Sequence, residues 1–275
     1  MIEIVPLSPA LGAEIRGVDA SQPLSPGDFQ KILEAWHQHL VILLREQTLD
    51  EEQQVAFAQR FGELSPIHTD HHSATNKAVM YIGNRKKDGK IVGALPLGEM
   101  QFHSDQCYNE RPAMGTMLYS IEIPSAGGNT LFANAYKAYD ALPADVKSII
   151  DGRKAVQVYD YGGGVLDRRH MVEPEKGLSF AHPVARTHPA TGRKALYVNR
   201  LMTHSILGLP REESERLLGL MFDTLERPEF IYEHRWRVGD VLLWDNRCTL
   251  HARRDFDPNE RRWLRRVTIR GEPPR

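Results

Sequence analysis

Residues 241–251 read VLLWDNRCTLH, a short apolar run followed by a polar turn and a histidine. The run 241–244 predicts a buried strand, and Asp245 and Asn246 are residue types that favour a turn directly after it. His251 follows this turn, so a rigid wall of the core would hold its imidazole, as a metal ligand requires. A capped turn with an incidental histidine is the alternative.

Similar short segments, apolar or alternating, recur through the rest of the chain between turn signals. Two helical stretches interrupt them, 135–150 with a break at Pro143, and 211–226. Many short strands with few helices favour a sandwich or barrel over an alternating βαβ sheet. The further predicted strands are 79–82, 101–105, 114–122, 130–133, 155–159, 195–199 and 263–269.

The part of the chain at about 25–62 is the most helical. A Ser-Pro pair at 25–26 is typical of a helix N-cap followed by a first-turn proline. Thr48 and Glu51 form a capping-box pattern that predicts a second helix. The apolar run 41–44 between the two helices predicts a buried strand. We therefore expect a mainly β protein with flanking helices.

Composition excludes several classes of protein. The 275 residues carry 35 Lys and Arg against 36 Asp and Glu, so the net charge of −1 gives no general attraction to nucleic acid or anionic lipid. No apolar run approaches the roughly 20 residues of a membrane-spanning helix, and no signal peptide is visible. Cys107 and Cys248 cannot make a disulfide framework, which favours a reduced, cytoplasmic protein.

No repeat or linker divides the sequence, so residues 1–275 are predicted to form a single domain. Two segments, 84–99 and about 161–178, are rich in glycine and charge and show no hydrophobic period. Such a composition is typical of surface loops, and a mobile cover over a site is the second interpretation.

Two histidines and one carboxylate on one face of a metal are a common ligand set for redox iron. Because residues two apart on a strand point the same way, His103 and Asp105 could supply two such ligands. His68 and Asp70 have the same spacing, and chance alone gives about one such pair in a chain of this kind. Residues 100–105 alternate as a half-buried strand does, whereas His68 lies in a polar stretch, so the pair at His103 is favoured.

The C-terminal segment 251–275 holds eight arginines. A solvated basic face or a nucleic-acid tail is the usual explanation for such a cluster, but its apolar residues indicate a partly buried strand. Strand alternation places Arg262 and Arg266 on one face with Leu264 and Thr268. An arginine that faces a barrel interior is costly unless an anion meets it, so both side chains imply anionic ligands.

Several separated blocks together resemble the iron(II)/2-oxoglutarate-dependent dioxygenase family of taurine dioxygenase and chlorophenoxyacetate dioxygenase. The resemblance covers nearly the whole chain, and its C-terminal block is more similar to the chlorophenoxyacetate branch. It implies a double-stranded β-helix, a cupin-like jelly-roll barrel with helices outside. The blocks are FHSD (102–105), PSAGGNT (124–130), HPVARTHPATGRKALYVN (182–199), WDNRCTLH (244–251) and RRWLRRVT (261–268).

The resemblance also implies a role for particular residues. His103, Asp105 and His251 match the three iron ligands of the catalytic centre. Arg262 matches the arginine that binds the far carboxylate of 2-oxoglutarate, and Thr130 matches the hydroxyl that assists it. In the same way, Arg266 matches the position that holds the acidic group of the substrate. His68 lies near a substrate-contacting histidine, and residues 84–99 correspond to a region that covers the site.

The activity so implied requires Fe(II), dioxygen and 2-oxoglutarate, which is decarboxylated to succinate. We expect hydroxylation of a small anionic substrate such as an aryloxyalkanoate or a sulfonate, with C–O, C–N or C–S cleavage where the hydroxylated carbon carries that substituent. Members of the family are commonly dimers or tetramers. One alternative is a metal-containing barrel that binds a small anion without oxidising it. Another is a zinc hydrolase, which is less favoured because no nucleophile or general base is indicated beside the metal.

Overall fold

The computed structural model describes residues 1–67, 73–95, 97–159 and 171–275. Its helices are α1 (Pro26–His39), α2 (Glu51–Gln59), α3 (Ala135–Asp140), α4 (Ala144–Ile150) and α5 (Arg211–Leu225), with two 3₁₀ turns, η2 (Pro174–Lys176) and η3 (Pro228–Phe230). Its strands are β1 (Glu3–Pro6), β2 (Ala13–Arg16), β3 (Val41–Leu44), β4 (Val79–Gly83), β5 (Lys86–Lys87), β6 (Lys90–Ile91), β7 (Met100–His103), β8 (Ala113–Glu122), β9 (Thr130–Asn134), β10 (Lys154–Val158), β11 (Ser179–Pro183), β12 (Ala185–Thr187), β13 (Lys194–Leu196), β14 (Thr203–Ile206), β15 (Ile231–His234), β16 (Val241–Asp245), β17 (Thr249–Arg253) and β18 (Trp263–Arg270).

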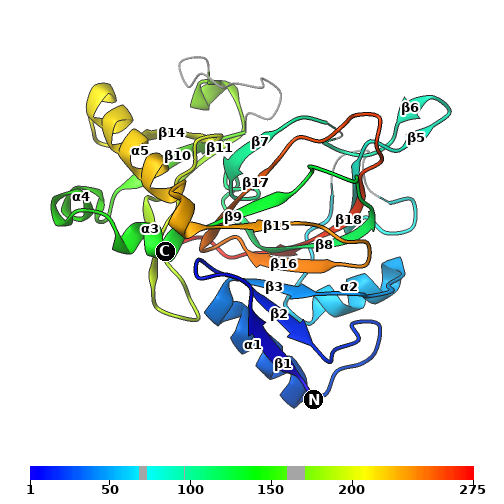
Figure 1. Ribbon diagram of the computed structural model, residues 1–275. Helices are drawn as coiled ribbons and strands as arrows, with labels where there is room; N and C mark the ends of the chain where they lie inside the picture. The colour runs from blue at the N-terminus through cyan, green and yellow to red at the C-terminus, as the bar shows by residue number, and fades with distance from the viewer. Residues whose placement is uncertain (68–72, 96, 160–170) are drawn as a thin grey trace.

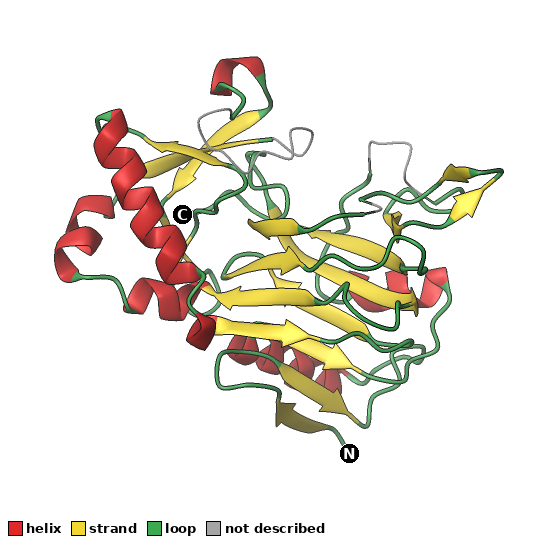
Figure 2. Cartoon of the chain, turned by 45° about the horizontal axis from the view of Figure 1, so that its top comes forward, coloured by secondary structure: helices red, strands yellow, loops and turns green. Residues whose placement is uncertain are grey.

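Two sheets face each other in the middle of the molecule (Figure 1). The larger has seven strands in the order β1-β2-β3-β16-β8-β18-β4, and the smaller has four in the order β15-β9-β17-β7. Apart from β2 and β3, the neighbouring strands that the structure describes run antiparallel. Figure 2 shows the helices grouped outside the strands. The sequence predicts this mainly β architecture with flanking helices correctly.

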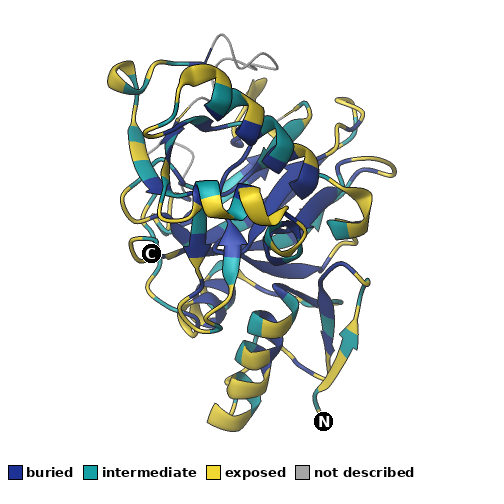
Figure 3. Cartoon of the chain, turned by 90° about the vertical axis from the view of Figure 1, so that its left-hand side faces the viewer, coloured by how far each residue is buried: buried dark blue, intermediate teal, exposed yellow. Residues whose placement is uncertain are grey.

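The main core lies between the two sheets. Leu242 and Leu264 project into it from the seven-stranded sheet, and Phe132 and Leu250 project into it from the four-stranded sheet. Each of these side chains is at most 2 % exposed. Figure 3 shows the buried strands at the centre and the exposed residues on outer helices and loops. Removing this apolar surface from water is the main driving force that holds the sheets face to face.

The outer face of the seven-stranded sheet is covered by α1 and α2. Leu243 and Val267 alternate along their strands with Leu242 and Leu264, so they point outward and belong to the cluster that contains Trp36 of α1. β16 is therefore buried on both faces. This explains why its sequence is a continuous apolar run and not an alternating one.

The start of α1 is predicted correctly, but the cap of α2 is not. Ser25 caps α1, and its Oγ accepts a hydrogen bond from the backbone N–H three residues along at 3.1 Å. The cap of α2 is Asp50, which accepts from Gln53 N at 2.8 Å while Gln53 Oε1 accepts from Asp50 N at 2.9 Å. This reciprocal pair takes the place of the predicted box of Thr48 and Glu51, which has the same spacing, because α2 begins at Glu51 and the residue before it is therefore the N-cap.

The other predicted elements are found with small shifts at their ends. The strands appear as β3, β4, β7, β8, β9, β10, β13, β16 and β18, and the helical stretches appear as α3, α4 and α5. The sequence does not predict β1, β2, β11, β12, β14, β15 or β17. Each of these is five residues or shorter, which is too short for a hydrophobic period to stand out.

The predicted loop at 84–99 contains a small hairpin of β5 and β6 that projects from the body of the molecule (Figure 1). Of the second predicted loop, 161–178, residues 161–170 lie outside the described residues, and the remainder contains η2. No helix among the described residues is long and apolar enough to cross a membrane.

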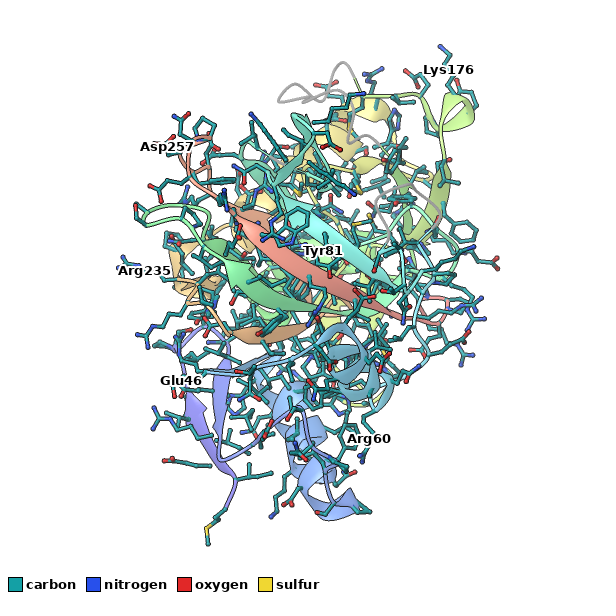
Figure 4. All side chains as sticks on the ribbon, turned by 90° about the vertical axis from the view of Figure 1, so that its right-hand side faces the viewer. Glu46, Arg60, Tyr81, Lys176, Arg235 and Asp257 are labelled. Carbon is teal, nitrogen blue, oxygen red and sulfur yellow. The ribbon has the colours of Figure 1, made fainter. Side chains whose placement is uncertain are left out.

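Gly83 lets β4 approach β18 closely at the edge of the large sheet. Figure 4 shows Tyr81, two residues earlier, on the strand beside β18. A Cβ at Gly83 would lie 1.7 Å from the carbonyl oxygen of Arg262, and φ is +142° there. We expect Gly83→Ala to lower the free energy of unfolding by at least about 2 kcal/mol in urea denaturation, because the backbone at Arg262 must move.

Gly89→Ala is the matched control. Gly89 also has a positive φ, +77°, but an added Cβ would meet no atom within 4 Å. We expect a loss of about 1 kcal/mol from conformational strain alone. Equal losses for the two variants would contradict the close approach at Gly83.

Candidate metal and anion site

Two histidines and an aspartate that lie far apart in the sequence meet on the four-stranded sheet. His103 at the end of β7 is paired in register with His251 of β17, and their ring centroids are 4.1 Å apart. Asp105 Oδ1 lies 3.9 Å from His103 Nε2 and 3.8 Å from His251 Nε2. All three residues are buried, and one ligand atom of each lies within 4.8 Å of the other two. The structure thus brings together the three predicted ligands.

Asp105 is positioned by a turn and not by the strand that the sequence predicts. β7 ends at His103, two residues before Asp105. Ser104 Oγ donates to Asn246 O at 2.9 Å, and Asp105 N donates to Asn246 Oδ1 at 3.3 Å. Thr116 Oγ1 on β8 donates to Asp105 Oδ2 at 2.6 Å. These contacts turn the other carboxylate oxygen, Oδ1, toward the two imidazoles.

The charge states of the cluster suit metal ligands. Burial lowers the pKa of His103 and lowers that of His251 well below its ordinary value, so both rings are neutral at pH 7. Burial alone would raise the pKa of Asp105, but the positive charge of Arg266, with the hydrogen bond from Thr116, brings it far below its usual range, so the carboxylate is ionised. His103 Nδ1 lies 2.8 Å from Gln101 O, so Nε2 is the ring nitrogen that faces Asp105.

Arg266 reaches the cluster from the opposite sheet. Its Nη2 lies 2.9 Å from Asp105 Oδ1, and its Nε donates to Thr268 Oγ1. The predicted alternation along β18 is correct at this point. Arg265, the next residue back, points to the other side of the sheet, where it donates to Gln54 Oε1 at 2.6 Å.

Arg262 is a second arginine on the inward side of β18. It is 2 % exposed, and among the described residues its side chain makes one hydrogen bond, from Nε to Gly128 O at 3.2 Å. Burial, and then the nearby charge of Arg253, lower the pKa of Arg262 to about 9. A Cβ at Gly128 would lie 3.0 Å from Arg262 Nε, and φ is +64° there, so this glycine makes room for the guanidinium.

Thr130 and His68 are the remaining predicted site residues. Thr130 is buried on β9 directly opposite Arg253 of β17, and its Oγ1 accepts a hydrogen bond from Trp236 Nε1 at 3.0 Å. Arg253 in turn is near enough to Arg262 to affect its pKa, so Thr130 belongs to the same region as Arg262. His68 lies outside the described residues.

Two residues of the site are not predicted from the sequence. Thr116 lies within the ten-residue strand β8, and the hydrophobic pattern of that strand does not predict a hydrogen bond to Asp105. Arg253 lies two residues after His251 on β17 and donates to three carbonyls, those of Leu95, Leu97 and Gly98. The signal in the sequence that could have identified Arg253 is its position two residues after the predicted ligand His251. Arg253 thereby ties the segment that follows β6 to the strand of His251.

The fold and the site agree with a family assignment. The family model described as "Taurine catabolism dioxygenase TauD, TfdA family" matches residues 3–268, and the chain belongs to this family. It is therefore an oxidoreductase of the dioxygenase class, as the sequence predicts. The resemblance quoted from separated sequence blocks is confirmed.

Individual relatives match over almost their whole length. The alpha-ketoglutarate-dependent 2,4-dichlorophenoxyacetate dioxygenase of Burkholderia sp. (strain RASC) is 32% identical over 96% of this chain and 93% of that protein. Pentalenolactone F synthase of Streptomyces avermitilis is 33% identical over 96% of this chain and 92% of that protein. A crystal structure of AAD-2 in complex with Mn(II) and N-oxalylglycine has a TM-score of 0.84 and 29% identity, covering 100% of this chain and 98% of that one. Such structural matches confirm the predicted jelly-roll fold.

Thr116→Val tests how Asp105 is oriented. The substitution keeps the shape of the side chain but removes the hydrogen bond to Oδ2, so the carboxylate can rotate away from the imidazoles. We expect Mn(II) binding, followed by the EPR signal of the free ion, to weaken about 10- to 100-fold.

The control is Thr249→Val, which removes a buried hydroxyl that donates to Asp245 O and makes no bond to Asp105. Both variants should lose about 1 kcal/mol of stability. Mn(II) affinity that falls equally in both would show that Thr116 has no specific role in the cluster.

Proposed function

We propose that this protein is an Fe(II)- and 2-oxoglutarate-dependent dioxygenase that hydroxylates a small anionic organic substrate. The observation that carries the proposal is the meeting of two neutral imidazoles and one ionised carboxylate in the buried interior. Arg262, which has no acidic partner among the described residues, lies on a strand of the facing sheet. Catalysis of this kind needs a metal face that leaves room for co-substrate and dioxygen, and three protein ligands provide it.

The donor set fits iron. His103 Nε2, His251 Nε2 and one oxygen of Asp105 would hold Fe(II), since these atoms already converge and carry the charges that a ferrous ion prefers. When bound, the metal supplies the redox chemistry with dioxygen and 2-oxoglutarate, and the protein supplies position and exclusion of water. The buried surroundings of the three ligands serve that exclusion.

Arg262 fits one end of a dicarboxylate. A guanidinium that is 2 % exposed and has no acidic partner among the described residues is costly, and a carboxylate would offset that cost through two parallel hydrogen bonds. Arg262 would therefore bind the far carboxylate of 2-oxoglutarate, assisted by the hydroxyl of Thr130. The crystal structure of AAD-2 contains Mn(II) and N-oxalylglycine, which supports a divalent metal and a small dicarboxylate as the two ligands of this chain.

Arg266 would hold the acidic group of the substrate. Its guanidinium shares Asp105 Oδ1 with the two histidines, so a divalent cation at that oxygen would repel it and release it toward an anion. The name of the 2,4-dichlorophenoxyacetate dioxygenase supports a carboxylate as that anion. His68 is proposed as a second substrate contact on the resemblance alone. The expected product is a hydroxylated carbon, with bond cleavage where that carbon carries oxygen, nitrogen or sulfur.

A screen for substrate-stimulated succinate tests this function. We expect purified protein with Fe(II), dioxygen and 2-oxoglutarate to form succinate, faster in the presence of one member of a panel of aryloxyacetates, sulfonates and other small acids. Asp105→Ala should lose all turnover, and His204→Ala, a partly exposed histidine with no bond to the cluster, should keep it. If a substrate and 2-oxoglutarate bound without succinate ever forming, the alternative of a metal-containing anion binder would be favoured.

Arg262→Gln tests the co-substrate site separately. Losing a charged, bidentate partner should raise the KM for 2-oxoglutarate about 30- to 100-fold, with a smaller effect on kcat. Arg261→Gln is the control, because that neighbouring side chain is 75% exposed and lies 3.9 Å from Glu122. A KM that stays unchanged in Arg262→Gln would remove Arg262 from the co-substrate site.

A further inference from the structure

Arg186 is a buried arginine outside the proposed catalytic site. It lies on β12 and is 2 % exposed, which makes it one of the largest fully buried side chains. Within the described part of the chain, no carboxylate lies within ion-pair distance of its guanidinium and its side chain makes no hydrogen bond of normal geometry. Its Nε is buried without a partner.

The other buried arginines show how unusual this is. Arg247 is paired with Asp245 Oδ2 at 2.6 Å, and Arg265 donates to one side-chain amide and two carbonyls. Arg253 donates to three carbonyls. Arg262 alone resembles Arg186 in this group, and the proposed function assigns an anion to Arg262. Buried charges are paired as a rule, so an unpaired guanidinium points to a ligand.

Among the described residues, no neighbour of Arg186 forms an ion pair with it. Its positive charge acts on Tyr197, His182 and Cys248. Burial raises the pKa of Tyr197 and of Cys248, and it lowers the pKa of His182 to about 4. All three groups are therefore neutral at pH 7. The guanidinium lies 4.8 Å from the ring centroid of Tyr197, a cation–π contact that offsets part of the cost of burial.

The hydroxyl of Tyr197 is a second donor without an acceptor. It is buried and makes no hydrogen bond of normal geometry, although both Ser104 and Arg186 are near enough to lower its pKa against the larger effect of burial. Two donors, one of them charged, thus lie side by side, and neither Arg186 Nε nor the Tyr197 hydroxyl makes a hydrogen bond of normal geometry with the described residues. Ser104 is the residue between the predicted metal ligands His103 and Asp105, so the Tyr197 hydroxyl lies close to that segment of the chain.

We propose that Arg186 and the Tyr197 hydroxyl bind a small monovalent inorganic anion, and that the physiological ligand is chloride. A compact anion accepts from several donors at once and carries the charge that Arg186 lacks, whereas a water molecule supplies no charge. Because both side chains are buried, a small ion is favoured over a larger organic acid. The site is distinct from Arg262 and does not depend on the proposed catalytic activity. An anion there would fix Tyr197, and through it the surroundings of Ser104.

Bromide is the direct probe. Crystals of the full chain grown with Mn(II) and N-oxalylglycine, so that the proposed co-substrate site is filled, would be soaked in sodium bromide and measured at the bromine absorption edge. We expect an anomalous peak within hydrogen-bond distance of the Arg186 guanidinium and the Tyr197 hydroxyl. A water molecule alone at that position, or an equal peak in Arg186→Met crystals, would overturn the proposal.

Thermal unfolding provides the test in solution. At equal ionic strength, and with the same Mn(II) and N-oxalylglycine present, the Tm of the wild type should be about 2–4 °C higher in sodium chloride than in sodium gluconate. This difference should vanish in Arg186→Met and shrink in Tyr197→Phe, which keeps the aromatic ring. Arg265→Met should retain the full difference, because it removes a buried arginine whose donors are already satisfied.

If Arg186→Met does not fold, the wild type and Tyr197→Phe still decide the matter. A wild-type Tm that is the same in both salts contradicts the proposal, as does a chloride effect of full size in Tyr197→Phe together with absent bromide density. Failure of the succinate assay would leave this site untouched, since neither bromide density nor the salt effect requires turnover.

Discussion

One buried carboxylate connects the two sheets of this protein. Asp105 is 1 % exposed, and it is contacted by Thr116 and Arg266 from the seven-stranded sheet and faces His103 and His251 on the four-stranded sheet. A charge removed from water costs several kcal/mol unless partners surround it. The positions of β7, β8, β17 and β18 are therefore constrained together, and the same constraint brings two neutral imidazoles to one carboxylate oxygen. The proposed metal chemistry depends on this arrangement.

Much of this arrangement is predictable from local sequence. The continuous apolar run of β16 predicts a strand that is buried on both faces. The alternation of side chains along β18 predicts which of its residues point inward, Arg262 and Arg266 among them. The N-cap at Ser25 is a local signal, and it is correct for the same reason. The resemblance of separated blocks then orders the ligands, although they lie about 150 residues apart in the sequence.

The features that sequence reasoning missed depend on contacts between distant segments. Asp105 is placed by a turn that Asn246 holds, so the strand predicted to extend to Asp105 is wrong, although Asp105 does lie beside His103. The cap of α2 is Asp50 and not Thr48, and the sequence does not separate the two because their capping patterns overlap within the six residues 48–53. No sequence pattern near Arg253 or Arg186 indicates which groups surround them in the fold. A buried guanidinium is distinguished by which acceptors lie around it, and a single sequence does not contain that information.

The net charge of the chain is near zero, but some arginines in its interior have no acidic residue beside them. Among the described residues, Arg262 and Arg186 are the buried arginines that lack an acidic partner and also lack a full set of neutral acceptors, and each is expected to meet an anion from solution. The central claim, that His103, Asp105 and His251 hold Fe(II) where 2-oxoglutarate can chelate it, is tested most directly by anaerobic titration with Fe(II) and then 2-oxoglutarate. A weak visible charge-transfer band should appear in the wild type and be absent in Asp105→Ala. No band in the wild type, or an equal band in the variant, would contradict the account.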